Sequence, residues 1–195
     1  MPPEDEVRTW TRQVGGLTYT CSTDPGLIQL DAVNAAFDSD MLYWAQPLAP
    51  EGLKRCVEQS LCFGLYESLP RPSSYEQTFI ACPDLKMIGL ARLVTDYVTF
   101  GYLTDVYVLA EHQGKGLGRW MMECLDEVLA SWPKLRRCLL FTRDESAVKL
   151  YRETLGMSDV SETPSAKLFL LERHAAMVQG RAYKQARPKA EDGQR

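Results

Sequence analysis

The chain has 195 residues, of which 45% are hydrophobic, 25% charged and 10% aromatic, and its formal net charge at pH 7 is −4. This length suits one domain with a sizeable core, and the composition excludes disordered and fibrous proteins. The acidic balance gives no global electrostatic reason to bind nucleic acid or an anionic membrane.

The cysteines and the N-terminus bear on metal binding and on the compartment. Six cysteines occur without CxxC spacing and only two histidines accompany them, which argues against a zinc site or a disulfide framework. The segment "MPPEDEVRTW" is acidic and has no apolar targeting core, and the chain has no run of about 18 apolar residues. We therefore expect a cytoplasmic protein without a metal.

The ends of the chain differ in composition from its middle. Residues 1–15 and 179–195 are polar and lack apolar periodicity, so we expect both to be poorly ordered or peripheral. One folded domain is expected over residues 16–178. The short basic run "RAYKQARPK" near the end is balanced by acidic residues elsewhere and gives little support to nucleic-acid binding.

The first half of the domain predicts two strands and two helices. "LTYTCSTD" predicts a strand, and the apolar spacing of "GLIQLDAVNAAFDSDMLYW" predicts a helix. "APEGLKRCVEQSL" predicts a second helix with Pro50 in its first turn. "CFGLYES" then predicts a strand, and the proline-rich "LPRPSSY" predicts a loop.

The second half predicts four strands and two helices. "KMIGLARLVTD" and "FGYLTDVYVLA" predict neighbouring antiparallel strands. Apolar residues at every third or fourth position from Leu117 to Trp132 predict an amphipathic helix that Pro133 ends. "LRRCLLFT" predicts a strand, "DESAVKLYRETLG" a helix ending at Gly156, and "AKLFLLER" a last strand that could pair across a dimer.

This order of elements predicts the α/β (α+β) class. We expect a central mixed, largely antiparallel sheet, flanked by helices on both faces.

The stretch "HQGKGLG" stands between a predicted strand and a predicted helix. The first amides of a helix have no intrahelical partner, and glycines allow phosphate oxygens to approach them closely. Lys115 and Arg119 add cations there, so the turn predicts a pyrophosphate site. The spacing fits neither the GxxxxGK[ST] loop of magnesium nucleotide enzymes nor the GxGxxG dinucleotide fingerprint.

Two motifs together resemble the GNAT superfamily of acetyl-CoA-dependent N-acetyltransferases. The turn matches the family pattern [QR]xxGx[GA] at Gln113, Gly116 and Gly118, and the segment "DESAVKLYRETLGM" is similar to its NxxAxxLYxxxGF pattern. The resemblance covers about Leu27 to Leu171. Asp144 stands where the family usually has Asn, and Met157 where it usually has Phe; a carboxylate cannot donate a hydrogen bond to a pantetheine carbonyl unless it is protonated.

The resemblance implies roles for residues on the strand before the turn, on the turn itself and on the last predicted helix. Tyr151 would protonate the departing thiolate, although its helical spacing alone would equally suit a half-buried core aromatic. The strand backbone would pair with the pantetheine arm, and the turn would hold the CoA pyrophosphate. The implied cofactor-binding residues are Val106, Tyr107, Val108, Gln113, Gly114, Lys115, Gly116, Leu117, Gly118, Arg119 and Asp144.

A general base must take the proton of the acceptor amine. Asp105 is the first candidate because it lies on the strand just before the turn, and Asp96 is the second; either could instead be a hydrogen-bonding turn residue. His112 is expected at the surface. Cys62 and Cys124 are interpreted as core residues rather than nucleophiles.

The acceptor pocket has aromatic candidates. Tyr43 and Trp44 lie between the first two helices, where they could plug a helix end or, by resemblance, form one wall of the pocket. On the wall they would favour an aryl-bearing or cationic substrate. Tyr66 and Arg92 are weaker candidates on neighbouring strands.

The sequence therefore predicts an N-acetyltransferase that moves acetyl from acetyl-CoA directly to an amine in a ternary complex. A small-molecule amine is the expected acceptor, with a protein N-terminus or lysine as the alternative. A CoA-binding sensor without catalytic activity is the alternative from another class. No nucleic-acid or membrane partner is expected, and a homodimer is possible.

Overall fold

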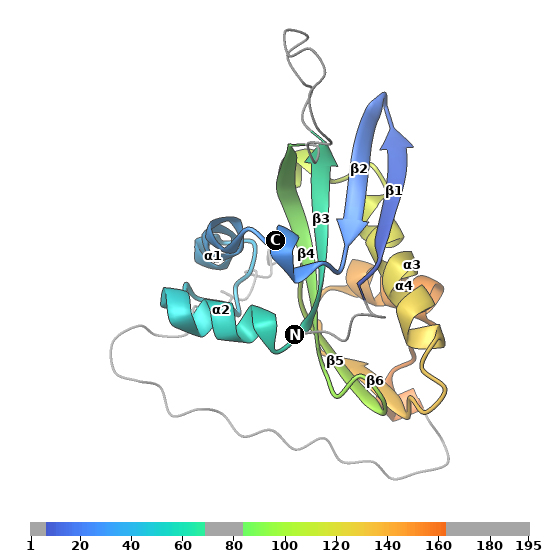
Figure 1. The fold of residues 1–195 in the computed structure, drawn as a ribbon. Coiled ribbons are helices and arrows are strands. Elements are labelled where there is room, and N and C mark those ends of the chain that lie inside the picture. Colours follow the sequence, from blue (N-terminus) through green and yellow to red (C-terminus); the bar gives the residue numbers. More distant parts are fainter. Residues whose placement is uncertain (1–6, 69–83, 163–195) are drawn as a thin grey trace, which may run out of the picture. The chain divides into compact units, whose positions relative to one another are not determined.

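A computed structural model describes residues 7–68 and 84–162 of the chain (Figure 1). The elements in chain order are β1 (Thr9–Val14), β2 (Leu17–Ser22), η2 (Pro25–Leu27), α1 (Leu30–Asp38), α2 (Pro50–Glu58), β3 (Leu61–Ser68), β4 (Leu85–Thr95), β5 (Phe100–Val108), η3 (Ala110–His112), α3 (Leu117–Ala130), β6 (Arg137–Leu140), α4 (Glu145–Leu155) and η4 (Val160–Glu162). The chain divides into two compact units, Met1–Ser158 and Asp159–Arg195. Of the elements above, η4 belongs to the second unit and the rest to the first.

The strands of the described residues form one sheet in the order β1-β2-β3-β4-β5-β6. Neighbours are antiparallel from β1 to β5, and β6 runs parallel to β5. Helices α1 and α2 lie on one face of the sheet, and α3 and α4 lie on the other (Figure 1). The expected fold class, a mixed and largely antiparallel sheet between helices, is confirmed.

The side chains of β3 alternate between two hydrophobic clusters, one on each face of the sheet. Leu61, Phe63 and Leu65 belong to the cluster that contains α3, which we call the α3-side cluster. Cys62 and Tyr66 belong to the cluster that contains α1 and α2, the α1/α2-side cluster. Because both faces are covered, "LCFGLY" is an unbroken apolar run. Burial of each large side chain contributes roughly 1.5–3 kcal/mol to stability.

The predicted apolar stripe of α3 is buried along its length. It comprises Leu117, Trp120, Met121, Cys124, Leu125, Val128, Leu129 and, beyond the helix end, Trp132. The helix stops at Ala130, three residues before the proline expected to end it. A proline disfavours helical backbone at the residue before it. The α-helical hydrogen-bond pattern has already ended at Ser131, whose amide donates to the carbonyl of Val128, three residues earlier.

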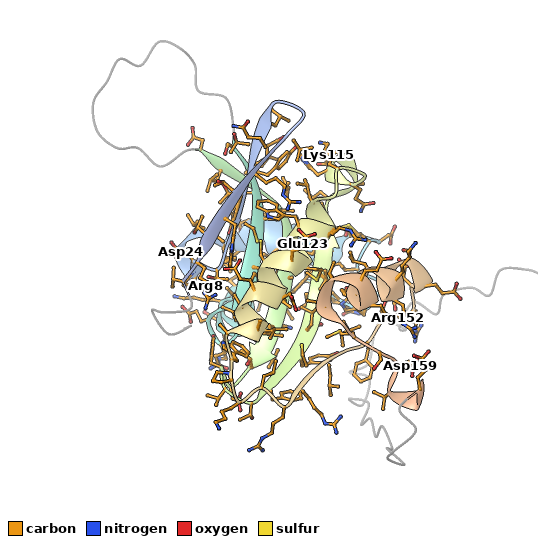
Figure 2. The ribbon with its side chains drawn as sticks, turned by 90° about the vertical axis from the view of Figure 1, so that its right-hand side faces the viewer. Arg8, Asp24, Lys115, Glu123, Arg152 and Asp159 are labelled. Atoms are coloured by element: carbon orange, nitrogen blue, oxygen red, sulfur yellow. The ribbon has the colours of Figure 1, made fainter. Side chains whose placement is uncertain are left out.

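The N-terminal segment differs from the expectation. Residues 1–15 were expected to be poorly ordered or peripheral, but Thr9–Val14 form the edge strand β1, paired with β2 along its full length. The Trp10 indole donates to Glu127 of α3 at 2.9 Å, and the Arg12 guanidinium donates to Glu123 at 3.1 Å. Figure 2 labels Glu123 on α3. Contacts with a helix more than 100 residues away in the sequence hold β1 in place. Because these contacts are polar, they produce no apolar periodicity in the sequence that would indicate a strand.

The strands β5 and β6 pair over four residues only and then separate. Their pairing runs from Phe100 with Arg137 to Leu103 with Leu140. Beyond Leu103, β5 continues to Val108 with β4 on one side, and its other backbone edge has no strand partner within the described residues. An open strand edge therefore leads directly to the glycine turn before α3.

Some expectations fall outside the described residues. These are the loop "LPRPSSY", the last strand "AKLFLLER" with its possible dimer pairing, and the polar tail from residue 179. The domain boundary at residue 178 also stays a prediction.

Candidate functional site

The turn between β5 and α3 has a bare backbone. Gly114 and Gly116 have φ of +75° and +74°, which glycine adopts without steric cost. A Cβ atom at either position would meet no described residue within 4 Å, so the space beside them is open in this part of the structure. Gly116 is the N-cap of α3, and no side chain of residues 7–68 or 84–162 caps that helix. The first amides of α3 are therefore available to an anion.

Two cations stand beside this turn. Lys115, labelled in Figure 2 at the N-terminal end of α3, donates from Nζ to the Tyr19 hydroxyl at 3.3 Å. Its Nζ lies 5.8 Å from the centroid of the Tyr19 ring. The Arg119 guanidinium pairs with Glu153 of α4, and its hydrogen bond holds the pKa of Glu153 below the usual range. Both cations are exposed and can turn toward an anion at the turn.

The turn is tied to the open edge of β5 by a glutamine. Gln113 donates from Nε2 to the backbone oxygen of Val108 at 2.8 Å. The Val106 and Val108 side chains pack against the α3-side cluster, whereas Tyr107 is buried in the α1/α2-side cluster. The backbone between the bulge described below and the turn is thus fixed on both faces. Its edge has no strand partner within the described residues, although Gln113 occupies the oxygen of Val108.

Tyr151 of α4 is buried in the same α3-side cluster as Val106 and Val108. Its side chain is 9% exposed, and its hydroxyl has no hydrogen-bond partner within the described residues. Burial, with a smaller effect of the Asp144 charge, raises the pKa of Tyr151 to about 12. The phenol is therefore protonated at neutral pH and free to donate a hydrogen bond.

Asp105 lies in a bulge of β5. Between the pairs Leu90 with Tyr107 and Arg92 with Thr104, two residues of β5 face one residue of β4. Asp105 takes the left-handed conformation there, with φ of +52°. This conformation brings its carboxylate to the face of α1 and α2, where Arg92 donates from Nε to Oδ2 at 2.6 Å.

One aromatic side chain, that of Trp44, contacts this carboxylate, and a second packs on Trp44. The Trp44 indole donates from Nε1 to Oδ1 of Asp105 at 3.3 Å. The Tyr43 ring meets the Trp44 ring edge-on at a centroid distance of 4.8 Å, and the Arg143 guanidinium lies 5.5 Å from the Tyr43 centroid. Tyr43 and Trp44 are 39% and 42% exposed, so they do not plug a helix end. We call Tyr43, Trp44 and Arg143 the aromatic wall.

Comparison with known proteins identifies the family. The model of the acetyltransferase (GNAT) family matches residues 39–157. A protein of Gibberella zeae that is named as an acetyltransferase is 44% identical over 177 residues, which cover 89% of this chain and 93% of the relative. The chain belongs to the GNAT acetyltransferase family.

Solved structures agree with this assignment. A structure from Xanthomonas campestris pv. campestris that is assigned to the GNAT family is 27% identical, with a TM-score of 0.57, over 80% of this chain and 93% of that one. A Staphylococcus aureus protein described as a probable acetyltransferase is 19% identical, with a TM-score of 0.51, over 79% and 99% of the two chains. The second likeness concerns the fold alone.

The GNAT motifs fall on the elements described above. The [QR]xxGx[GA] motif forms the turn, and the second motif forms α4 from its cap to Gly156, which closes the helix with φ of +61°. Asp144, where the family usually has Asn, is the N-cap of α4 and accepts from the Ser146 amide at 2.8 Å. Its carboxylate is occupied by this cap, which an asparagine would form equally well.

Two expectations about candidate residues in this GNAT chain need correction, and for a third residue the structure favours the alternative role given above. His112 was expected at the surface but is 4% exposed, because η3 packs its ring edge-on against Tyr19. Tyr66, a candidate for the pocket wall, is fully buried in the α1/α2-side cluster and lines no open surface. Asp96 closes the turn between β4 and β5 by accepting from three backbone amides, so its carboxylate serves that turn and not the bulge.

The cysteine interpretation agrees with the structure. Cys62 and Cys124 are 4% and 3% exposed, and burial raises the pKa of Cys62 to about 12, which keeps it a thiol at neutral pH. Within the described residues, no group of three or more His, Cys, Asp or Glu side chains could hold a metal ion. No helix in the same ranges is both long and apolar enough to cross a membrane.

Several residues of the site were not predicted from the sequence. Ser60 accepts a hydrogen bond from Nη1 of Arg92 at 3.1 Å, and Arg143 completes the aromatic wall. Phe141 packs on Tyr102 at a centroid distance of 5.8 Å and is 61% exposed. Phe141 lies near the end of the predicted strand "LRRCLLFT" and Arg143 directly follows it, which is only a weak signal, and nothing in the sequence marks Ser60.

Proposed function

We propose that this GNAT protein is an N-acetyltransferase that moves acetyl from acetyl-CoA to an amine by direct transfer in a ternary complex. One observation carries the proposal: the open edge of β5 leads from the carboxylate of Asp105 to uncapped helix amides at Gly116. An elongated molecule with an anionic end and a peptide-like arm fits such a path. We further propose that the protein is cytoplasmic.

Acetyl-CoA would supply the activated acetyl group as a thioester. The amides from Gln113 to Arg119 would hold its pyrophosphate, because the turn is open beside Gly114 and Gly116 and has no side-chain cap. The backbone of Val106 to Val108 would pair with the pantetheine arm through the unpaired edge. Lys115 and Arg119 would add charge-assisted contacts.

Tyr151 would donate a hydrogen bond to the departing sulfur. A pKa of about 12 lies above the ordinary thiol value of about 8.5, so full proton transfer to a free thiolate would be uphill. A hydrogen bond that strengthens as negative charge develops needs no such transfer. The phenol keeps its proton over the whole physiological range.

For the acceptor, we propose a small-molecule amine with an aromatic or flat apolar group beside the nitrogen. The exposed faces of Tyr43 and Trp44 offer stacking surface. The carboxylate beside them is already paired with Arg92, and Arg143 adds another cation, so a polycation would meet net repulsion. A protein N-terminus or lysine is the alternative acceptor.

The test is release of free CoA thiol from acetyl-CoA with a panel of aryl amines, alkyl amines, polyamines, amino acids and short peptides. With an accepted amine, we expect Tyr151→Phe to lower kcat by about 10- to 100-fold, the value of one hydrogen bond to a charged group, with acetyl-CoA affinity within threefold. Because Tyr151 loses its proton only as pH rises through about 12, this residue should cause no fall in kcat below pH ~10. Binding of acetyl-CoA without turnover of any amine would favour the non-catalytic sensor.

A further inference from the structure

The connection between α1 and α2 carries Tyr43 and Trp44, the two aromatic residues of the aromatic wall, and is held at both ends. Leu42 is 1% exposed and fixes the start of the connection in the core. Near its end, Asn34 of α1 exchanges two hydrogen bonds with the backbone of Leu48, at 3.0 and 2.9 Å. Between these points, the hydrogen bond from Trp44 to Asp105 ties the wall to the sheet.

The acceptor of that bond is fixed from several sides. Asp105 is 6% exposed, and its Oδ2 accepts from Arg92 at 2.6 Å. Arg92 also donates to Ser60, and Ser60 in turn donates to the carbonyl of Cys56 at 2.8 Å. A continuous row of hydrogen bonds therefore runs from the end of α2, across β4 and β5, to Trp44.

The same contacts leave the Asp105 carboxylate little capacity to take a proton from an amine. Its Oδ2 is held by an arginine, and its Oδ1 accepts from both Trp44 and the Thr104 hydroxyl, at 3.3 and 3.2 Å. These three donors fill three of about four acceptor positions of the carboxylate, so an incoming amine could use only the remaining one, at a nearly buried group. A general base needs an accessible oxygen within hydrogen-bond reach of the proton it removes.

We propose that Asp105 is a positioning residue and not the general base: with Arg92, it holds the Trp44 indole in place and so fixes one wall of the acceptor pocket. The pocket itself rests on the proposed function, but the contact between Asp105 and Trp44 does not. The left-handed bulge is what makes the contact possible, because regular β backbone at this position would turn the carboxylate to the opposite face.

The first test reads the position of Trp44 without any substrate. Acrylamide quenching of tryptophan fluorescence is measured for the wild type and for Asp105→Asn. For each protein, the fluorescence of a matched variant that also carries Trp44→Phe is subtracted, which leaves the signal of Trp44. Asparagine tolerates the left-handed backbone, so the fold is expected to persist. We expect the quenching constant of Trp44 to rise at least 1.5-fold in Asp105→Asn. Thr104→Val, which removes another donor to the same carboxylate, should leave it unchanged.

The second test separates positioning from base catalysis, with 2-phenylethylamine and hexylamine as acceptor probes. We expect Asp105→Asn and Trp44→Phe to raise KM for 2-phenylethylamine at least threefold, with kcat within threefold and an unchanged pH profile. Their double variant should be no worse than the worse single variant, because both break one contact.

Two results would overturn the proposal. One is an unchanged quenching constant of Trp44 in Asp105→Asn. The other is a 100-fold or greater loss in kcat for that variant, with KM unchanged and the acidic limb of the pH profile gone, while Trp44→Phe behaves as the wild type. If neither probe is acetylated, the quenching result alone decides, and the failure belongs to the proposed function.

Discussion

At the residue scale, two glycines of this chain differ in the space available beside them. Gly64 of β3 lies beneath the Tyr66 side chain, so that a Cβ there would come within 2.1 Å of the hydroxyl oxygen and 2.5 Å of the ring carbon Cζ. Tyr66 is fully buried and has no room to move. Gly52 lies in α2, and a Cβ there would meet nothing within 4 Å.

Alanine at these two positions should therefore change stability in opposite directions. We expect Gly64→Ala to lower the free energy of unfolding by about 1–3 kcal/mol through overpacking. Gly52→Ala should raise it by up to about 1 kcal/mol, because alanine loses less backbone entropy in a helix. Urea unfolding of both variants beside the wild type measures the two changes. Equal shifts of the same sign would mean that Tyr66 does not occupy the space above Gly64.

The sequence predicted the elements on which the candidate residues lie better than it predicted the contacts of those residues. Tyr151 and the glycine turn follow from local motifs, and the structure puts them on the expected helix and loop. The pairing of Asp105 with Arg92 and Trp44 depends on a bulge that changes the face to which a side chain points. A bulge of one residue leaves no periodic signal in the sequence, and neither does the burial of His112 in a short turn.

At the element scale, α4 has a complete pair of end signals. Asp144 caps its first turn by accepting from the amide and the hydroxyl of Ser146, at 2.8 and 2.7 Å, and Gly156 ends it. These hydrogen bonds lower the pKa of Asp144 from its usual value. Because α4 carries Tyr151, the cap also sets the position of the proposed acid.

Substitutions of Asp144 should separate capping from charge. We expect Asp144→Ala to destabilise the protein by about 1 kcal/mol and Asp144→Asn to be nearly neutral at pH 7. The carboxylate has a lowered pKa in the folded state, so its contribution is present above the unfolded pKa of about 4 and is lost as pH falls through the folded value. Thermal unfolding of the three proteins at pH 7 and pH 3 measures this. If the wild type exceeds Asp144→Ala in stability by as much at pH 3 as at pH 7, capping by the ionised carboxylate of Asp144 is contradicted.

The elements with strong periodicity or clear end signals were predictable, and β1 was not. Pro50, Asp144 and Gly156 mark helix ends through local backbone chemistry, and the stripe of α3 repeats over four turns. Among the described residues, the strand Thr9–Val14 has a partner strand on one edge only, and most of its side chains are exposed. Its stability comes from β2 and α3, which its own sequence cannot reveal.

At the scale of the whole molecule, the proposed site exists because β5 has different partners at its two ends. Near its start, β5 pairs with both β4 and β6. Beyond Leu103 it pairs with β4 alone among the described residues, and its other edge is open as far as the glycine turn. The net charge of −4 favours no anionic ligand, so an anion must be held by local amides and by Lys115 and Arg119. The proposed function therefore depends above all on acetyl-CoA binding along this open edge, with its pyrophosphate at Gly116.

Calorimetric titration of acetyl-CoA into the wild type, Gly116→Ala and Gly16→Ala examines that binding without any acceptor amine. Both glycines have positive φ, +74° and +81°, with open space where a Cβ would lie, so alanine strains the backbone similarly in each. Gly16 lies in the turn between β1 and β2 and is not among the residues proposed to hold acetyl-CoA. We predict that Gly116→Ala weakens binding at least tenfold, while Gly16→Ala stays within twofold of the wild type. Equal affinities in all three proteins, or no binding by the wild type, would show that the glycine turn does not hold acetyl-CoA.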